Sequence, residues 1–390
     1  MAIPQNVDNY SYVVMLISLI SIIIGYCVTK QMDKREEAHC TKTYEKTSAL
    51  VNVERAVRIL SIISACCLIA VNTESAIYVQ IFGYLSSYLG VKSVLPGIIT
   101  QTADMMPMIF AFYLATIPSK KEAKGPIVLY IIAMALNLFA GRRYEAVSAV
   151  LLLVLYATYR NKIDEEKWIK RAHIVLLIAL VPVVMIFLIL MESWRAGGSG
   201  KPISIKLLAE FLNSVGSSSQ VISYEHMFHA DLASRNVLYS FGNVWRSLNG
   251  NAIAQLLGVS TAYGTQTVEN ALYGHSISAY IMYRINPSRM LEGGGIGSCY
   301  MAELMCDFSY IGLIIGNFLI GVILQKLSGL KSNHLISNFL TVFLATALFR
   351  MPRDSFDYFF YQLLGIKSLA LFLFVWIVYH QKSRCANNLE

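Results

Sequence analysis

The sequence predicts an all-α polytopic membrane protein with about 9 to 11 transmembrane helices and a large outer loop of short amphipathic helices. Of its 390 residues, 56% are hydrophobic and only 14% are charged, which argues against a soluble domain. Several apolar runs approach the ~20 residues that a helix needs to cross a bilayer. The stretch 192–300 is also apolar, but it is interrupted. We treat residues 1–390 as a single transmembrane domain that contains this outer loop region.

Nine apolar runs are predicted to cross the membrane, which places the two termini on opposite sides. The first reads as an uncleaved anchor with its N-terminus outside, because no positive charge precedes it and no small-residue cleavage site follows. The segment 72–98 is predicted to be an outer apolar shelf, since a tenth crossing would move the basic loops outside. The predicted spans are 11–29, 56–72, 97–117, 126–141, 144–159, 172–192, 307–325, 333–349 and 358–379.

Basic residues set the orientation of these spans. The loops 30–58, 118–125, 160–171 and 326–332 and the C-terminal tail hold most of the lysines, and basic loops face the cytoplasm. Twelve basic residues are then predicted outside, and nine of them are arginine. They are Lys92, Arg142, Arg143, Arg195, Lys201, Lys206, Arg235, Arg246, Arg284, Arg289, Arg350 and Arg353. Because guanidinium grips phosphate with a planar fork, this face is predicted to bind an anion.

The outer loop region, 192–300, is predicted to form a shelf of short helices over the outer mouth of the bundle. Ile203, Leu207, Leu208, Phe211 and Leu212 have the spacing of a helix lying in the membrane interface. The segment 272–286 is apolar but too short to cross. An active site between this shelf and the spans is the arrangement that we expect.

Several familiar chemistries are not supported by the sequence. It has no P-loop motif, and the glycine cluster 293–297 is not flanked by a strand and a helix, as a dinucleotide site requires. It also has no DxD pair, no CxxC and no Cys/His spacing of a metal site. His226 and His229 can share a helical face but lack a third ligand. We expect no cofactor and no required metal, and nucleic acid is discarded as a partner.

The candidate anion-binding residues are the arginines at predicted span ends and in the outer loop. Simple interfacial snorkelling is the alternative for Arg142 and Arg143 at the end of the fourth span. For Arg350 and Arg353 the alternative to anion binding is an ion pair, of Arg353 with Asp354 or of Arg350 with Asp357. For the outer-loop arginines it is a solvated surface. The set predicted to bind a diphosphate is Arg142, Arg143, Arg350, Arg353, Arg195, Arg246 and Arg289.

Three residues are considered as the acid or base: Glu303, Glu292 and His275. Glu303 lies near the start of an apolar span, where a carboxylate is costly to bury unless it is paired, so we expect it to face a cavity or an arginine. His275 can titrate near neutral pH, although a lone histidine is more often structural. Outer tyrosines and tryptophans favour an interfacial belt, and a minority of them can stack on sugar rings.

Part of the chain resembles the bacterial O-antigen polymerases of the Wzy type. The resemblance is carried by GHSI at 274–277, GGGIGS at 293–298, AEL at 302–304 and DFSYIG at 307–312, with GRR at 141–143 and FR at 349–350. It implies a metal-independent, inverting glycosyltransferase of the GT-C kind at the periplasmic face of the inner membrane. Such an enzyme joins undecaprenyl-diphosphate-linked oligosaccharide repeat units.

The resemblance also implies roles for residues and partners. Arg142, Arg143 and Arg350 would stabilise the departing diphosphate, and Glu303 or His275 would accept the proton of the attacking sugar hydroxyl. The implied partners are lipid-linked donor and acceptor, membrane lipid and a chain-length regulator protein. An O-antigen ligase that passes the glycan to lipid A core is the alternative. A transporter or flippase is weaker, because it should carry charges at mid-membrane. A purely structural role in a polysaccharide assembly complex is a further alternative, but it does not explain the outer arginine cluster.

Overall fold

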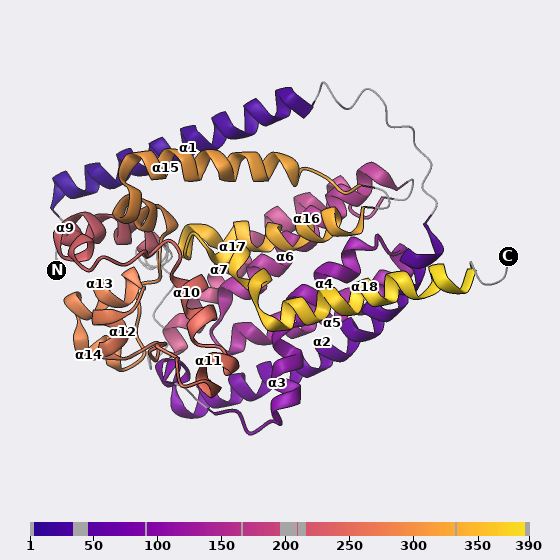
Figure 1. Cartoon of the computed structure of the whole chain (residues 1–390), viewed down its shortest axis with the longest axis horizontal. Helices are drawn as coiled ribbons and strands as arrows, with labels where there is room; N and C mark the ends of the chain where they lie inside the picture. Colours follow the sequence, from indigo (N-terminus) through magenta and orange to yellow (C-terminus); the bar gives the residue numbers. More distant parts are fainter. Residues whose placement is uncertain are drawn as a thin grey trace. The chain divides into compact units, whose positions relative to one another are not determined.

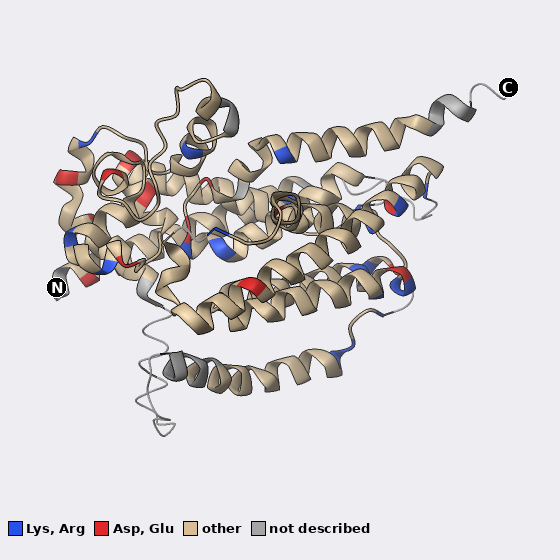
Figure 2. Cartoon of the chain, turned by 90° about the horizontal axis from the view of Figure 1, so that it is seen from below, with Lys and Arg blue, Asp and Glu red and all other residues tan. Residues whose placement is uncertain are grey.

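The computed structural model describes residues 4–33, 46–89, 92–164, 167–195, 209, 216–331 and 334–386, and all regular secondary structure within them is helical. Six helices are long and apolar enough to cross a membrane, and a pair bent at Met105 adds a seventh. The prediction of an all-α polytopic membrane protein is confirmed. Lys, Arg, Asp and Glu are sparse along these long helices, as a lipid-facing surface requires (Figure 2).

Each of the nine predicted spans coincides with helix in Figure 1. Two of them, Arg171–Phe187 and Ile366–Gln381, are shorter apolar helices, so nine crossings stay a prediction. The long helices are α1 (Gln5–Asp33), α2 (Ser48–Phe82), α3 (Gly97–Asp104) with α4 (Met106–Ala115), α5 (Lys120–Phe139), α6 (Arg143–Ile163), α7 (Arg171–Arg195), α15 (Tyr300–Lys326), α16 (Leu335–Arg350) and α18 (Ile366–Ala386).

Short helices make up the rest of the described chain. They are η2 (Leu85–Tyr88), η3 (Gly216–Ser219), α9 (Gln220–Ser234), α10 (Gly242–Asn249), α11 (Ala252–Leu256), α12 (Val268–Tyr273), α13 (Ile277–Ile285), α14 (Pro287–Leu291), η4 (Met351–Arg353), α17 (Tyr358–Tyr361) and η5 (Gln362–Leu364). We call residues 216–299 the outer region, after the side predicted for them. Short helices are present there, and their position as a shelf over the outer mouth of the bundle stays a prediction. The amphipathic helix predicted at 203–212 lies outside the described residues, apart from residue 209.

The segment 72–98 differs from the prediction. Its first part, to Phe82, continues the second span as the last third of α2, which is 35 residues long. Asn72 explains why the helix does not stop there, because its buried side chain donates to the backbone oxygen of Ala133 at 2.7 Å. A polar residue that ends a hydropathy window does not end a helix when it has an internal partner.

The described residues form two compact units, and α2 passes from one to the other at Ser64. The first unit holds residues 1–64, 105–118 and 218–390. In it α1 runs beside α15 (Figure 1). A side chain at Gly25 would lie 2.2 Å from the Phe318 carbonyl oxygen, and one at Gly321 would lie 2.1 Å from that of Ile22. The two backbones therefore touch only because both positions are glycine.

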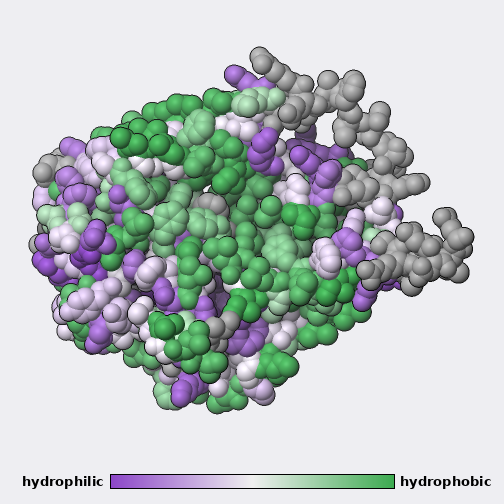
Figure 3. Space-filling model, viewed as in Figure 1, coloured by the Kyte–Doolittle hydropathy of each residue, from purple (hydrophilic) through white to green (hydrophobic). Residues whose placement is uncertain are grey.

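The outward face of α1 carries exposed apolar residues such as Leu16, Leu19 and Ile23 (Figure 3). A face of this kind is stable in lipid. A second packing site in the same unit joins α4 to α16, where the Phe112 and Phe339 rings stack at 3.9 Å. The α15 helix is broken at Ser309, whose φ of 56° departs from helical geometry.

The second unit holds residues 65–104 and 119–217. Within it α5 and α6 form an antiparallel hairpin through a tight turn. Gly141 adopts a φ of 83°, and its N–H donates to Leu138 O at 3.0 Å while that of Arg142 donates to Asn137 O at 2.8 Å. These two bonds are those of a Schellman cap, which needs the left-handed conformation that glycine adopts without steric cost.

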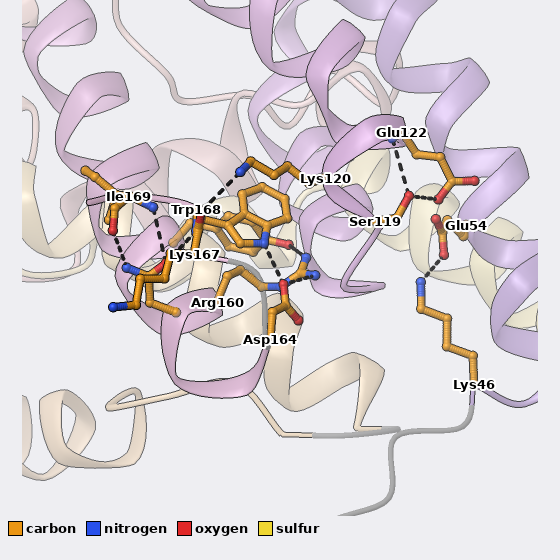
Figure 4. A network of polar contacts seen from close by, with 12 residues as sticks. Lys46, Glu54, Ser119, Lys120, Glu122, Arg160, Asp164, Lys167, Trp168 and Ile169 are labelled. Carbon is orange, nitrogen blue, oxygen red and sulfur yellow. Dashed lines mark hydrogen bonds and ion pairs between the residues drawn. The ribbon is translucent and has the colours of Figure 1, made fainter. Parts of the chain in front are cut away.

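The turn between α6 and α7 is closed by a charged network (Figure 4). Arg160 is buried and its guanidinium lies 2.6 Å from the Asp164 carboxylate, with Tyr156 accepting a second bond at 2.9 Å. The Trp168 indole N–H donates to the same carboxylate at 2.5 Å, and its ring covers the guanidinium. Both terminal nitrogens of this buried arginine are therefore used inside the protein, one on Asp164 and one on Tyr156.

Candidate functional site

Helix α10 is positioned by a carboxylate from outside the outer region. Asp357 is fully buried, and its oxygens accept from the backbone N–H of Val244 at 2.8 Å and from the Asn243 side chain at 2.9 Å. Asn243 also donates to the Ser355 hydroxyl at 2.6 Å. An acidic group at the start of a helix satisfies free amides and complements the helix dipole. Burial raises the pKa of Asp357 above its usual range.

Two carboxylates of α15 fix neighbouring loops in the same way. Asp307 accepts from the backbone N–H of Tyr239 at 3.1 Å and of Ser240 at 2.7 Å. Glu303 accepts from the Phe356 backbone N–H at 2.8 Å and from the Ser298 hydroxyl at 2.7 Å. Asp307, Glu303 and Asp357 thus hold the outer region and the turn 351–357 to each other through backbone amides. We call these three residues the carboxylate anchors.

This placement of Glu303 differs from the expectation. The side chain is buried, with 3% of its surface exposed, and both of its oxygens are occupied by donors. Among the residues that the structure describes, no arginine pairs with it and no cavity described below includes it. We expected the carboxylate to face an open cavity or an arginine. The sequence does not show which backbone N–H groups lie near a carboxylate, so the contact with Phe356 could not be predicted. The structure gives it a positioning contact, and its role as a base stays untested.

Arg246 of α10 stands between two cavities of the outer region, each of about 190 Å³. Asn270 lines both cavities with it. The first cavity is completed mainly by Trp245, Tyr263 and His275. The second is rich in hydroxyl and amide groups, including Thr265, Gln266, Ser276 and Ser278. Cavities with a guanidinium, hydroxyls and aromatic rings suit a ligand that is both anionic and sugar-like.

The guanidinium of Arg246 has little compensation within the described chain. Its hydrogen-bond partner there is the neutral Asn270 side chain, at 3.4 Å. Burial lowers the pKa of Arg246, while the nearby Tyr361 and Asp357 act against that shift. A half-buried cation that lines cavities without a carboxylate salt bridge favours an anionic ligand.

His275 faces the same first cavity as Arg246. Its ring packs on Trp245 at 5.0 Å, and its Nδ1 lies 3.1 Å from the Leu238 carbonyl oxygen. A carbonyl can only accept, so Nδ1 carries the hydrogen and Nε2 is the basic nitrogen of the neutral ring. Gly242 makes this approach possible, because a side chain there would lie 2.2 Å from the His275 backbone oxygen.

Arg289 and Arg353 flank the glycine cluster that borders the second cavity. The exposed Arg289 lies over Gly294, where a side-chain carbon would come within 2.6 Å of its Cγ. Arg353, also exposed, donates to the Ser218 hydroxyl at 2.8 Å, and Ser218 lies beside Gly297. Gly293 and Gly297 have φ of 96° and 79°. The glycines therefore provide a tight turn in which two arginine-bearing segments approach the cavity wall.

Arg350 has an ion-pair partner, but not the one expected. Its Nε lies 2.6 Å from the Asp354 carboxylate, its Nη1 donates to the Tyr358 hydroxyl at 3.0 Å, and its guanidinium covers the Tyr358 ring. Arg353 bonds to Ser218 as described, and Asp357 caps α10. Ion pairing, the alternative to phosphate binding, is thus found for Arg350, with Asp354 four residues further along the chain.

The remaining predicted arginines belong to the second unit. Arg142 is exposed and precedes α6, and Arg143 is its first residue and half-buried. Arg195 is the last residue of α7, and its side chain lies outside the described part. Their proposed contact with a diphosphate stays a prediction.

Sequence reasoning missed Asn270 and the carboxylate anchors Asp307 and Asp357. Asn270 accepts from Arg246, donates to Thr265 O at 3.0 Å and fits beneath Gly274, where a side chain would lie 2.4 Å from its Oδ1. A polar residue inside a short helix was the available signal. Apart from the Asn243 side chain on Asp357, the partners of the two aspartates are backbone amides, which no residue type in the sequence indicates.

A comparison with family models assigns the chain to one family. The model described as O-antigen polysaccharide polymerase Wzy matches residues 4–382. No curated protein and no solved structure matches the chain.

Proposed function

The chain belongs to the O-antigen polysaccharide polymerase Wzy family, and from this premise we propose that it polymerises undecaprenyl-diphosphate-linked repeat units at the periplasmic face of the inner membrane. The reaction is a metal-independent glycosyl transfer that inverts the anomeric centre. Its site is the pair of cavities around Arg246. The observation that supports this most directly is a half-buried guanidinium that lines two polar cavities without a carboxylate salt bridge among the described residues.

In the proposed step, a hydroxyl oxygen of the acceptor unit attacks the anomeric carbon of the donor glycan. The bond from that carbon to the diphosphate oxygen breaks, and the lipid diphosphate leaves with the electron pair. Negative charge grows on the leaving diphosphate, so a fixed cation stabilises the transition state more than the ground state. Arg246 supplies that cation, with Arg289 and Arg353 at the border of the second cavity.

The hydroxyl proton passes to Nε2 of His275. The Leu238 carbonyl fixes the ring in the tautomer in which Nε2 is free to accept it. Of the two bases considered from the sequence, His275 lines a cavity with Arg246, whereas Glu303 has both oxygens occupied. Glu303 is therefore assigned a positioning role, together with Asp307 and Asp357.

The test is polymerisation by the purified full chain in lipid nanodiscs, supplied with undecaprenyl-diphosphate-linked repeat units and analysed as a ladder of glycan lengths. Arg246→Lys keeps the charge but loses the fork. We expect its rate to fall by roughly 10²- to 10³-fold, the usual effect of removing one donor to a developing anion. His275→Gln should lose rate by roughly 10²- to 10⁴-fold.

The matched control is Arg284→Lys. Arg284 is exposed and pairs with Asp231 at 3.1 Å, so this substitution should leave the ladder unchanged. A wild-type ladder from Arg246→Lys would exclude Arg246 as the diphosphate ligand. If the folded wild type makes no ladder, adding lipid A core as the acceptor tests the ligase alternative.

A further inference from the structure

A cluster of three potential metal ligands lies where α1, α9 and α15 meet, apart from the cavities around Arg246. Glu225 and His229 are one turn apart on α9, and Cys306 comes from α15. Their nearest ligand atoms all lie within 4.8 Å of one another. Sequence inspection paired His229 with His226 and found no third ligand. The structure brings the missing ligands from Glu225 and from a helix about eighty residues further along.

We propose that Glu225, His229 and Cys306 bind one Zn²⁺ ion that joins the outer region to the first turns of α15. Thiolate, imidazole and carboxylate are the three ligand types of zinc in proteins. Three protein ligands leave a fourth tetrahedral position for water.

The spacing of the cluster is compatible with zinc. Bonds of about 2.0–2.3 Å at tetrahedral angles separate ligand atoms by roughly 3.3–3.6 Å. The structure has the His229 Nδ1 at 2.7 Å from a Glu225 oxygen and the whole set within 4.8 Å. Zinc binding would require side-chain rotations of His229 and Cys306 that open the first distance and shorten the others, and His229 is half exposed.

The electrostatic surroundings also favour a cation. The Glu225 side chain is fully buried, and a second carboxylate, Asp307, lies close enough to repel it. The Tyr10 hydroxyl donates to Glu225 at 3.3 Å and holds its second oxygen. A neighbour that fixes the orientation of a ligand carboxylate is a regular part of zinc sites. A divalent ion would neutralise the buried charge that Tyr10 and His229 only partly compensate.

Zinc here would stabilise the attachment of the outer region and would take no part in glycosyl transfer. The ligands Glu225 and His229 lie in the outer region, and Cys306 lies on α15 between the carboxylate anchors Glu303 and Asp307. A bound ion would therefore add a fourth connection to the three that those anchors provide. A ligand that binds only to the folded state raises the free energy of unfolding.

The test measures metal content and spectrum rather than activity. The full chain in nanodiscs is stripped with a chelator under a reductant that keeps Cys306 as thiol, reloaded with Zn²⁺ and freed of excess metal. We expect one zinc per chain by mass spectrometry. After Co²⁺ loading we expect a thiolate-to-cobalt charge-transfer band. Cys306→Ser and His229→Gln should each lower the affinity by more than the ~10–100-fold that loss of an outer partner costs.

Two substitutions serve as matched controls. Cys27→Ser removes an exposed thiol elsewhere on α1, and His226→Gln removes the neighbouring histidine, which stacks on Tyr10. Both should retain the metal and the cobalt band. Equal zinc in wild type and Cys306→Ser would overturn the proposal, and so would a wild type that binds none. If Cys306→Ser does not fold, His229→Gln decides alone, because it changes a half-exposed side chain.

Discussion

Replacing Glu303 with glutamine tests whether this residue anchors the fold or performs chemistry. Glutamine has nearly the same shape, but only one end of its amide accepts hydrogen bonds. The Phe356 N–H and the Ser298 hydroxyl now donate to opposite carboxylate oxygens. In Glu303→Gln the amide oxygen can still accept from the Phe356 N–H, and the Ser298 hydroxyl can rotate to accept from the NH₂ group, so both contacts persist as neutral hydrogen bonds.

The size of the effect follows from these two contacts. A hydrogen bond to a charged group contributes ~1.5–3 kcal/mol, whereas a neutral one contributes ~0.5–1.5 kcal/mol, and both contacts change in this way. Removing the buried charge offsets part of this loss. We expect the free energy of unfolding to fall by about 1–2 kcal/mol, which lowers the folded-to-unfolded ratio by roughly 5- to 30-fold.

The assay is reversible unfolding of the full chain in mixed detergent micelles, followed by tryptophan fluorescence. Glu292→Gln is the control, because Glu292 is exposed, and its stability should be unchanged. If Glu303→Gln is as stable as the wild type, the anchoring role is wrong. If in addition it makes no polymer, the carboxylate acts in the reaction as a base.

Three further predictions use the same preparation. Gly141→Ala should lower the free energy of unfolding by about 1–2 kcal/mol because its φ is 83°, whereas Gly125→Ala, inside α5 and without neighbours, should raise it by about 0.5–1 kcal/mol. Arg350→Lys tests the sequence-based prediction that Arg350 binds the diphosphate: that role predicts loss of polymer in a protein that stays folded, whereas a role confined to its contacts with Asp354 and Tyr358 predicts wild-type chain lengths. Burial raises the pKa of Asp357, so its stabilising contribution is complete below about 3.8 and is lost as the pH rises through the raised value. The stability difference between wild type and Asp357→Asn should fall across that window and a flat difference would refute this.

The helices of this protein could be predicted because a helix that crosses a lipid bilayer needs a long run of apolar residues. Each predicted span lies in helical structure, and the predicted ends 141 and 144 agree with the break between α5 and α6. The predicted helix ends were wrong where the end depends on a contact with a residue far away in the sequence. Asn72 stays in α2 because it bonds to Ala133. The long helix in the last predicted span, α18, begins at Ile366 rather than 358, because the segment before it forms the short helices α17 and η5.

The candidate site was predictable in composition but not in arrangement. An arginine-rich outer face is visible in the sequence, whereas the partner of each arginine is not. Arg350 and Arg246 look alike in the sequence, yet the first forms an ion pair with Asp354, whereas the side chain of the second hydrogen-bonds only to Asn270 among the described residues. Glu303 shows the same limit, because its donor at Phe356 lies 53 residues away and is a backbone amide.

The carboxylate anchors have a consequence for how such an enzyme can change during evolution. Most of the groups that they hold, at Tyr239, Ser240, Val244 and Phe356, are backbone amides. Every amino acid except proline offers that amide. The attachment itself therefore sets no requirement on the side chains at these positions. If the cavities around Arg246 bind the glycan as proposed, a lineage can change the side chains that line them without changing the contacts that hold the outer region to the membrane helices.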